Sequence, residues 1–100
     1  MTAAEMSGKL KPRTRRMAIV NKRGLHARAS ARFVETVASF DAAIEVEKDG
    51  ITVGGTSIMG LMMLAASPGC SITVRASGSE AEAALDALDA LVSAGFGEES

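Results

Sequence analysis

The spacing of hydrophobic residues changes early in the chain. An apolar, β-branched run over residues 17–21 predicts a strand that ends at the polar turn Asn21-Lys22-Arg23-Gly24. From Ala27 to about Ser39 the apolar residues recur every three or four positions, which predicts an amphipathic helix. The apolar face implied by this spacing consists of Ala27, Ala31, Phe33, Val34, Val37 and Ala38.

Alternating apolar and polar residues follow in the middle of the chain. Residues 43–47 and 51–53 alternate on either side of Asp49-Gly50, which predicts a β-hairpin about an Asp-Gly turn. Residues 58–64 are apolar enough for a short helix. Ser57 directly precedes this run, so its hydroxyl suits the N-terminal cap.

The last third of the chain predicts one strand and one helix. Residues 71–76 alternate again, and a second amphipathic pattern follows them. Ser79 and Glu82 have the spacing of a capping box, and Gly95 is a natural stop. The apolar face of this helix comprises Ala81, Leu85, Leu88 and Val92.

These elements occur in the order βαββαβα. At least three of the strands have one polar face, so the helices should cover one side of the sheet and leave the other in water. The prediction is an α+β fold: an open-faced sandwich with a four-stranded, mainly antiparallel sheet and three helices on one face.

Composition limits the function classes. One hundred residues, 47% of them hydrophobic, are enough for one folded domain. The three aromatic residues are all Phe, too few for a platform that stacks single-stranded nucleic acid. Cys70 is the single cysteine and His26 the single histidine, so neither an intrachain disulfide nor a zinc site is expected. No lysine follows Gly54-Gly55 in a phosphate-loop pattern, so we expect no bound nucleotide. We likewise expect no metal and no cofactor.

Charge is unevenly distributed along the chain. Residues 1–16 hold five of the eleven basic residues and one of the twelve acidic ones, which gives them a net charge of +4 and the remainder −5. We interpret residues 1–16 as a flexible basic arm whose removal changes stability little, residues 17–96 as the domain, and residues 97–100 as a C-terminal tail. Nucleic-acid binding through residues 9–16 and a short presequence are the alternatives. No export signal or membrane-spanning run is visible, so the expected location is the cytoplasm.

His26 lies where the first predicted strand's exit turn meets the first helix. Free N–H groups and the helix dipole favour an anion at such a position. A largely neutral imidazole is a nucleophile toward phosphorus, and Arg28 can pair with phosphate oxygens. For a lone histidine, a solvent-exposed helix cap is the simpler interpretation, and local chemistry alone leaves both open.

The run NKRGLHARAS resembles the active-site motif of the histidine-containing phosphocarrier proteins (HPr family) of bacterial phosphotransferase systems. The resemblance extends over residues 17–96 and includes GGTSIMGLMMLAASPG with its serine. It implies that His26 is phosphorylated on Nδ1, with Arg28 as charge partner and the backbone N–H groups of Ala27 and Arg28 facing the phosphate. Ser57 would be the serine that a kinase modifies in some members. Ala29 departs from the family pattern, because many members have proline there.

The resemblance also implies the partners of this chain. It would be no enzyme, but a monomeric carrier between an enzyme I-type phosphoryl donor and an enzyme IIA-type acceptor, with a serine kinase/phosphorylase as a further partner. A short helix that is apolar nearly all round must expose part of its surface, which predicts a docking patch. The patch consists of Ile58, Met59, Met62 and Met63. The alternative role is a regulatory interaction module of a nitrogen or carbon signalling relay.

Overall fold

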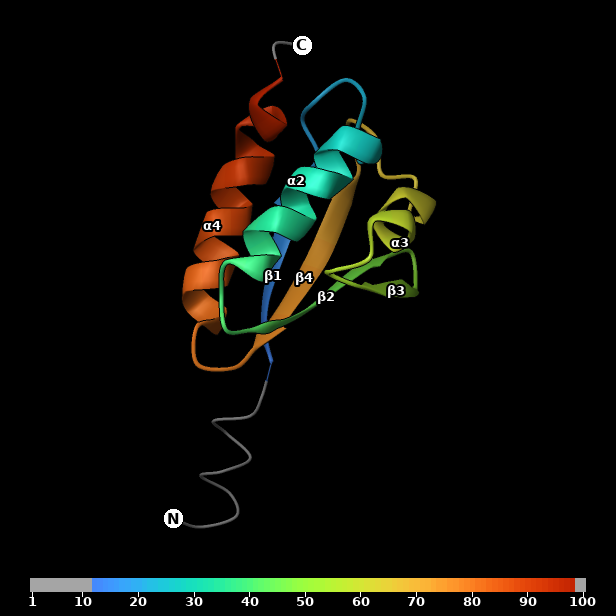
Figure 1. The fold of residues 1–100 in the computed structure, drawn as a ribbon. Coiled ribbons are helices and arrows are strands. Elements are labelled where there is room, and N and C mark those ends of the chain that lie inside the picture. The colour runs from blue at the N-terminus through green and yellow to red at the C-terminus, as the bar shows by residue number, and fades with distance from the viewer. Residues whose placement is uncertain (1–11, 99–100) are drawn as a thin grey trace, which may run out of the picture.

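Four strands form one sheet, and three helices cover one of its faces (Figure 1). The structure is a computed structural model and describes residues 12–98. Within that range the strand order is β1-β4-β2-β3, and every neighbouring pair is antiparallel. The elements are β1 (Arg13–Ala18), α2 (Ala27–Ala38), β2 (Ala43–Lys48), β3 (Ile51–Gly54), α3 (Ile58–Met63), β4 (Ser71–Ser77), α4 (Ala81–Ser93) and the 3₁₀ turn η1 (Gly95–Gly97). The predicted open-faced α+β sandwich is confirmed.

The β2–β3 hairpin turns at the predicted Asp-Gly pair. Asp49 and Gly50 have φ values of 52° and 81°, so both central residues are left-handed. Two-residue turns of this kind match the twist of the flanking strands. The resulting register places Val46 opposite Val53 on one side and opposite Val74 of β4 on the other.

β1 begins four residues earlier than the apolar pattern predicts. Its pairing with β4 runs from Arg13, opposite Ala76, to Ala18, opposite Ser71. Arg13 and Arg15 point toward α4 and form ion pairs with its acidic residues, the shortest with Glu82 (2.8 Å) and Asp86 (2.9 Å). Arg13 and Arg15 thus occupy strand positions where the hydrophobic pattern would require apolar residues. For this reason the pattern did not predict the first part of β1.

The predicted boundary of the basic arm is therefore wrong at its C-terminal end. Residues 13–16 belong to the sheet, so deleting residues 1–16 would remove part of β1 and its pairing with β4. The rest of the arm, residues 1–11, lies outside the described residues.

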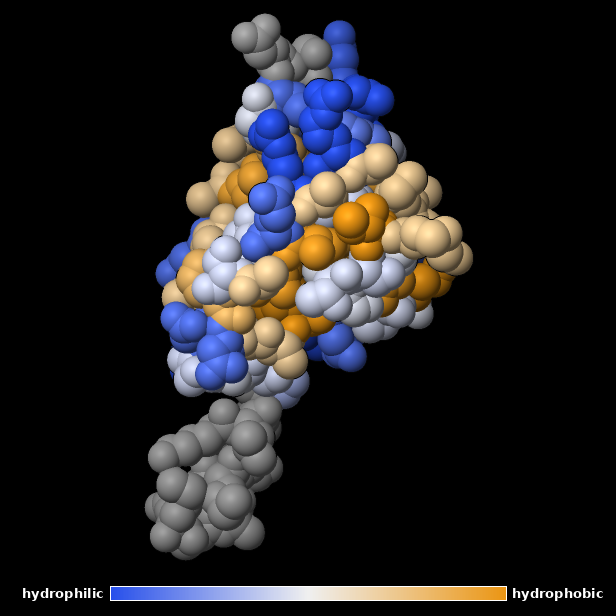
Figure 2. Space-filling model, viewed as in Figure 1, coloured by the Kyte–Doolittle hydropathy of each residue, from blue (hydrophilic) through white to orange (hydrophobic). Residues whose placement is uncertain are grey.

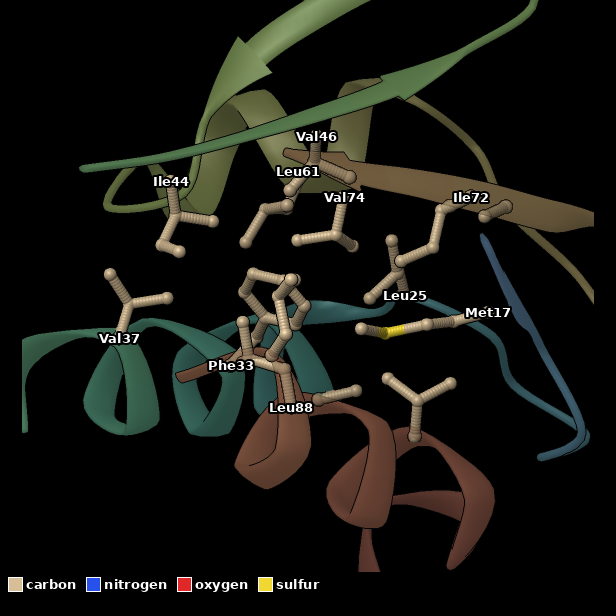
Figure 3. Packing of buried hydrophobic residues seen from close by; sticks show 14 of the residues in the cluster. Met17, Leu25, Phe33, Val37, Ile44, Val46, Leu61, Ile72, Val74 and Leu88 are labelled. Carbon is tan, nitrogen blue, oxygen red and sulfur yellow. The ribbon is translucent and has the colours of Figure 1, made fainter. Parts of the chain in front are cut away.

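The core lies between the sheet and the helices (Figure 3). Phe33 of α2 is fully buried, as are Val46 and Val74 from the central strands. Burying a side chain of this size contributes about 1.5–3 kcal/mol. On α2 the buried residues are Ala29, Ser30, Phe33 and Val37, whereas Ala27 and Ala38 are exposed. The predicted face was wrong at both ends, because the large side chains of Phe33 and Val37 outweigh alanines in setting the rotation of the helix.

The predicted capping box of α4 does not form. Ser79 Oγ donates to Asp41 Oδ2 (2.7 Å), and Glu82 pairs with Arg13. The N-cap is Glu80, whose side chain accepts instead from the backbone N–H of Asp41 (2.8 Å). Ser79, Glu80 and Glu82 thus bind residues outside α4 instead of the backbone N–H groups at the start of the helix. The predicted apolar face of α4 is confirmed, since Ala81, Leu85, Leu88 and Val92 are all buried.

Candidate functional site

The loop before α2 is fixed by contact with the segment that joins α3 to β4. Gly24 has a φ of 60°, and a side chain there would overlap the Ala66 carbonyl oxygen. The next residue, Leu25, donates its N–H to that same oxygen (3.0 Å) and is buried. This close approach of two backbones needs glycine, and it sets the position of the following residue, His26.

His26 is the N-cap of α2, and its imidazole is held at both nitrogens. Nδ1 accepts a hydrogen bond from the backbone N–H of Arg28 (3.2 Å). Nε2 lies in contact with Glu98 Oε2. A backbone N–H can only donate, so Nδ1 carries the lone pair and Nε2 the proton that is donated to the carboxylate. The side chain is only 14% exposed, and these two contacts fix the orientation of the ring.

Glu98 reaches this histidine because the chain turns sharply after α4. Gly95, Phe96 and Gly97 all have positive φ values, from 58° to 74°. Phe96 is buried, and its carbonyl oxygen accepts from the Arg32 guanidinium of α2. The turn is thereby anchored to the core, and Glu98 follows it directly over the N-terminal end of α2.

Asn21 completes this arrangement. Its Nδ2 donates to Glu98 Oε1 (2.8 Å) and to the Gly24 carbonyl oxygen (2.9 Å). Hydrogen bonds from Asn21 and then from His26 lower the pKa of Glu98, and the positive charge of Arg23 adds to the effect. The carboxylate is therefore ionised at neutral pH.

Sequence reasoning missed both of these residues. Asn21 lies in the NKRGLHARAS motif, where its position predicts only a turn, and no pattern in the sequence distinguishes Glu98 from other surface glutamates. The prediction of a tail at residues 97–100 is wrong for 97 and 98, which belong to η1 and the site. Residues 99–100 lie outside the described residues.

Ala27 and Arg28 lie in the exposed first turn of α2, directly after the imidazole. The Arg28 guanidinium has no carboxylate partner within residues 12–98, so it is available to an incoming anion. Ala29 is fully buried. Helix N-termini with free N–H groups bind anions readily.

Ser57 is the N-cap of α3, as predicted, and its Oγ accepts from the Gly60 N–H (2.9 Å). Leu61 and Leu64 turn inward and are buried. The residues of the predicted docking patch are exposed, with relative accessibilities of 40% for Ile58, 74% for Met59, 42% for Met62 and 74% for Met63. Figure 2 shows hydrophobic surface over α3, next to strongly hydrophilic surface around the N-terminal end of α2. α2 and α3 pack against each other, so the patch adjoins the His26 site.

Two negative findings apply to residues 12–98. Nowhere in this range do three or more His, Cys, Asp or Glu residues gather closely enough to hold a metal ion. No helix in the same range is long and apolar enough to cross a membrane.

Comparison with known proteins decides the family. The family model described as "PTS HPr component phosphorylation site" matches residues 13–94. The chain belongs to the HPr family. The match begins at Arg13, the first residue of β1, in agreement with the structure and not with the predicted boundary at residue 17.

Relatives in the HPr family share most of this chain. The phosphocarrier protein HPr of Cupriavidus necator is 44% identical over 80 residues, which cover 80% of this chain and 90% of the relative. A crystal structure of HPr from Thermoanaerobacter tengcongensis has a TM-score of 0.83 and 43% identity, covering 88% of this chain and 99% of that one. Another crystal structure from the same organism, of an HPr dimer, has a TM-score of 0.69 and 45% identity, with coverages of 82% and 94%. HPr-family membership gives this chain a phosphocarrier role in a phosphotransferase system.

Proposed function

We propose that His26 accepts the phosphoryl group and that Nδ1 is the nucleophile. The observation that carries this proposal is the hydrogen bond from the Arg28 backbone N–H to Nδ1, because it requires a lone pair on Nδ1 and places that atom at the exposed first turn of α2. No base has to remove a proton before attack, because the one ring proton is already on Nε2.

Arg28 and the first turn of α2 would hold the phosphoryl oxygens. The N–H of Arg28 that donates to Nδ1 before transfer is released when Nδ1 bonds to phosphorus, and it can then donate to a phosphoryl oxygen. The N–H of Ala27 lies at the same helix end. The Arg28 guanidinium adds a charge-assisted contact from the exposed side.

The docking patch on α3 would be covered by each protein partner in turn. Hydrophilic surface borders the patch at the N-terminal end of α2 (Figure 2), and the exposed residues just before and in the first turn of that helix include Lys22, Arg23 and Arg28. A matching partner surface would therefore have an apolar centre and acidic groups beside it. An enzyme I-type donor and an enzyme IIA-type acceptor are the partners that this role requires.

Ser57 would be the site of regulation by a serine kinase/phosphorylase. It is exposed, and phosphorylation would add about −1.5 to −2 charges beside the apolar patch. The N-terminal end of a helix tolerates that charge, whereas an apolar interface does not. Regulation would thus act on partner binding and leave the fold intact.

In this role the protein is a substrate of phosphotransferases and has no turnover or cofactor of its own. We propose that it works as a monomer in the cytoplasm, although two solved relatives are dimers. Neither a membrane surface nor nucleic acid is required, and Arg13 and Arg15 are already paired with carboxylates of α4. No observation favours the regulatory module of a signalling relay over the carrier role.

The test is phosphorylation with phosphoenolpyruvate and a purified enzyme I-type donor, followed by intact mass measurement before and after acid treatment. Wild type should gain one acid-labile phosphoryl group. His26→Ala should gain none while keeping its circular dichroism spectrum. Arg28→Ala should be phosphorylated more slowly, because the backbone N–H groups remain. Undiminished labelling of His26→Ala would refute the assignment.

A further inference from the structure

We propose that Glu98 is a positioning residue for phosphoryl transfer, which holds the His26 ring through Nε2 and stabilises the positive charge that the ring gains when Nδ1 is phosphorylated. This inference rests on the proposed role of His26 as the acceptor. If so, the segment after α4 contributes to phosphoryl transfer as well as to the packing of the core.

The first support is the geometry of the imidazole contacts. Glu98 contacts Nε2, and the backbone N–H of Arg28 donates to Nδ1, so the two ring nitrogens have opposite roles. The carboxylate lies on the side of the ring away from the nucleophile. It can therefore fix the position of the proton and the plane of the ring without obstructing an incoming phosphoryl group.

The second support is the charge balance of the transfer step. The Nδ1 lone pair forms the bond to phosphorus, and the bond between phosphorus and the phosphorylated donor protein breaks, with its electron pair staying on the donor. The proton on Nε2 stays where it is, so the ring gains one positive charge. A carboxylate hydrogen-bonded to that proton is attracted more strongly to the phosphorylated ring than to the neutral one.

The third support is that the carboxylate is held in place before transfer. Asn21 is only 3% exposed and donates to Glu98 Oε1, and the buried Phe96 anchors the turn that precedes Glu98. The groups facing this carboxylate are the amide of Asn21, the imidazole of His26 and the more distant Arg23, all of which favour its ionised form. A preorganised charge of this kind has no reorganisation cost at the moment of transfer.

The experiment compares Glu98→Ala and Glu98→Gln with wild type and with Glu82→Ala. Glu82 is a matched control, since it is an ion-paired glutamate at the opposite end of α4. The first readout is the equilibrium constant for phosphoryl exchange with the enzyme I-type donor. The second is the ¹⁵N-edited NMR signal of the ring N–H in the unphosphorylated protein, which does not depend on phosphoryl transfer.

We expect Glu98→Ala to shift the exchange equilibrium away from the phosphorylated carrier by about tenfold, the size expected for losing one charge-assisted hydrogen bond. The ring N–H signal should broaden through exchange with water. Glu98→Gln keeps an acceptor but no charge, so it should retain the ring N–H signal and still shift the equilibrium. Glu82→Ala should match wild type in both readouts.

The two proposals fail in different ways. If wild type takes up no phosphoryl group on His26, the proposed function fails. If wild type is phosphorylated on His26 and Glu98→Ala has the same exchange equilibrium, the role of Glu98 is refuted even where its thermal stability falls. A Glu98→Gln variant with the wild-type equilibrium would refute the charge argument.

Discussion

Replacing Gly24 with alanine should destabilise the protein far more than the same change at another left-handed glycine. Gly50 is the matched control, because it also has a positive φ but a methyl group added there would meet no other atom within 4 Å. Both variants incur the cost of a left-handed alanine, about 1–2 kcal/mol. Only at Gly24 does the new methyl group overlap a backbone oxygen, that of Ala66, and lie 3.0 Å from Ser67 Cα.

The extra cost at Gly24 has two sources. Separating the two backbones breaks the hydrogen bond from Leu25 to Ala66, about 0.5–1.5 kcal/mol, and the forced shift adds about 1–3 kcal/mol of packing strain. Gly24→Ala should therefore lose about 4 kcal/mol of unfolding free energy and Gly50→Ala about 1–2 kcal/mol, as measured by urea titration. Equal losses would show that the close approach at Gly24 does not constrain the loop that carries His26.

The remaining predictions concern the turn after α4 and the cap of α3. Phe96→Ala should cost about 3–5 kcal/mol in a urea titration, because the ring is fully buried, and a loss below about 1 kcal/mol would contradict its role as an anchor. Ser57→Ala should lose about 1 kcal/mol of unfolding free energy, because it removes the helix cap. Ser57→Asp should keep near wild-type stability but accept phosphoryl groups more slowly at low donor concentration. A wild-type rate for Ser57→Asp at low donor concentration would show that Ser57 is not part of the docking surface. The pKa of Glu98 is lowered below its usual 4.5, so its contribution to stability is present above that value and lost as the pH falls through the lower folded-state pKa. The stability difference between wild type and Glu98→Ala, followed by thermal melts, should thus shrink in acid, and a constant difference would exclude the ionised contact.

Local patterns were sufficient where neighbouring residues decide the structure. The hairpin at Asp49-Gly50 depends on two residues that tolerate positive φ, and the cap at Ser57 needs only a hydroxyl three residues before Gly60. The alternation in β4 likewise needs no knowledge of its partners.

Local patterns failed where a residue has a partner far along the chain. Arg13 and Arg15 occupy strand positions because acidic residues of α4 neutralise their charges. Ser79 does not cap α4, because its hydroxyl donates a hydrogen bond to Asp41 instead. The family resemblance pointed to His26, but Glu98 was missed. Its contact depends on a turn whose geometry only the folded core determines.

The separation of 72 residues between His26 and Glu98 also bears on synthesis. At 5–20 residues per second, a ribosome needs between roughly 4 and 14 s to proceed from the histidine codon to the glutamate codon. Until residues 71–77 are made, β1 lacks its partner strand β4, and until residue 98 is made the imidazole lacks its contact with Glu98. With the role proposed for Glu98, an unfinished chain would therefore be a poorer recipient of phosphoryl groups than a finished one.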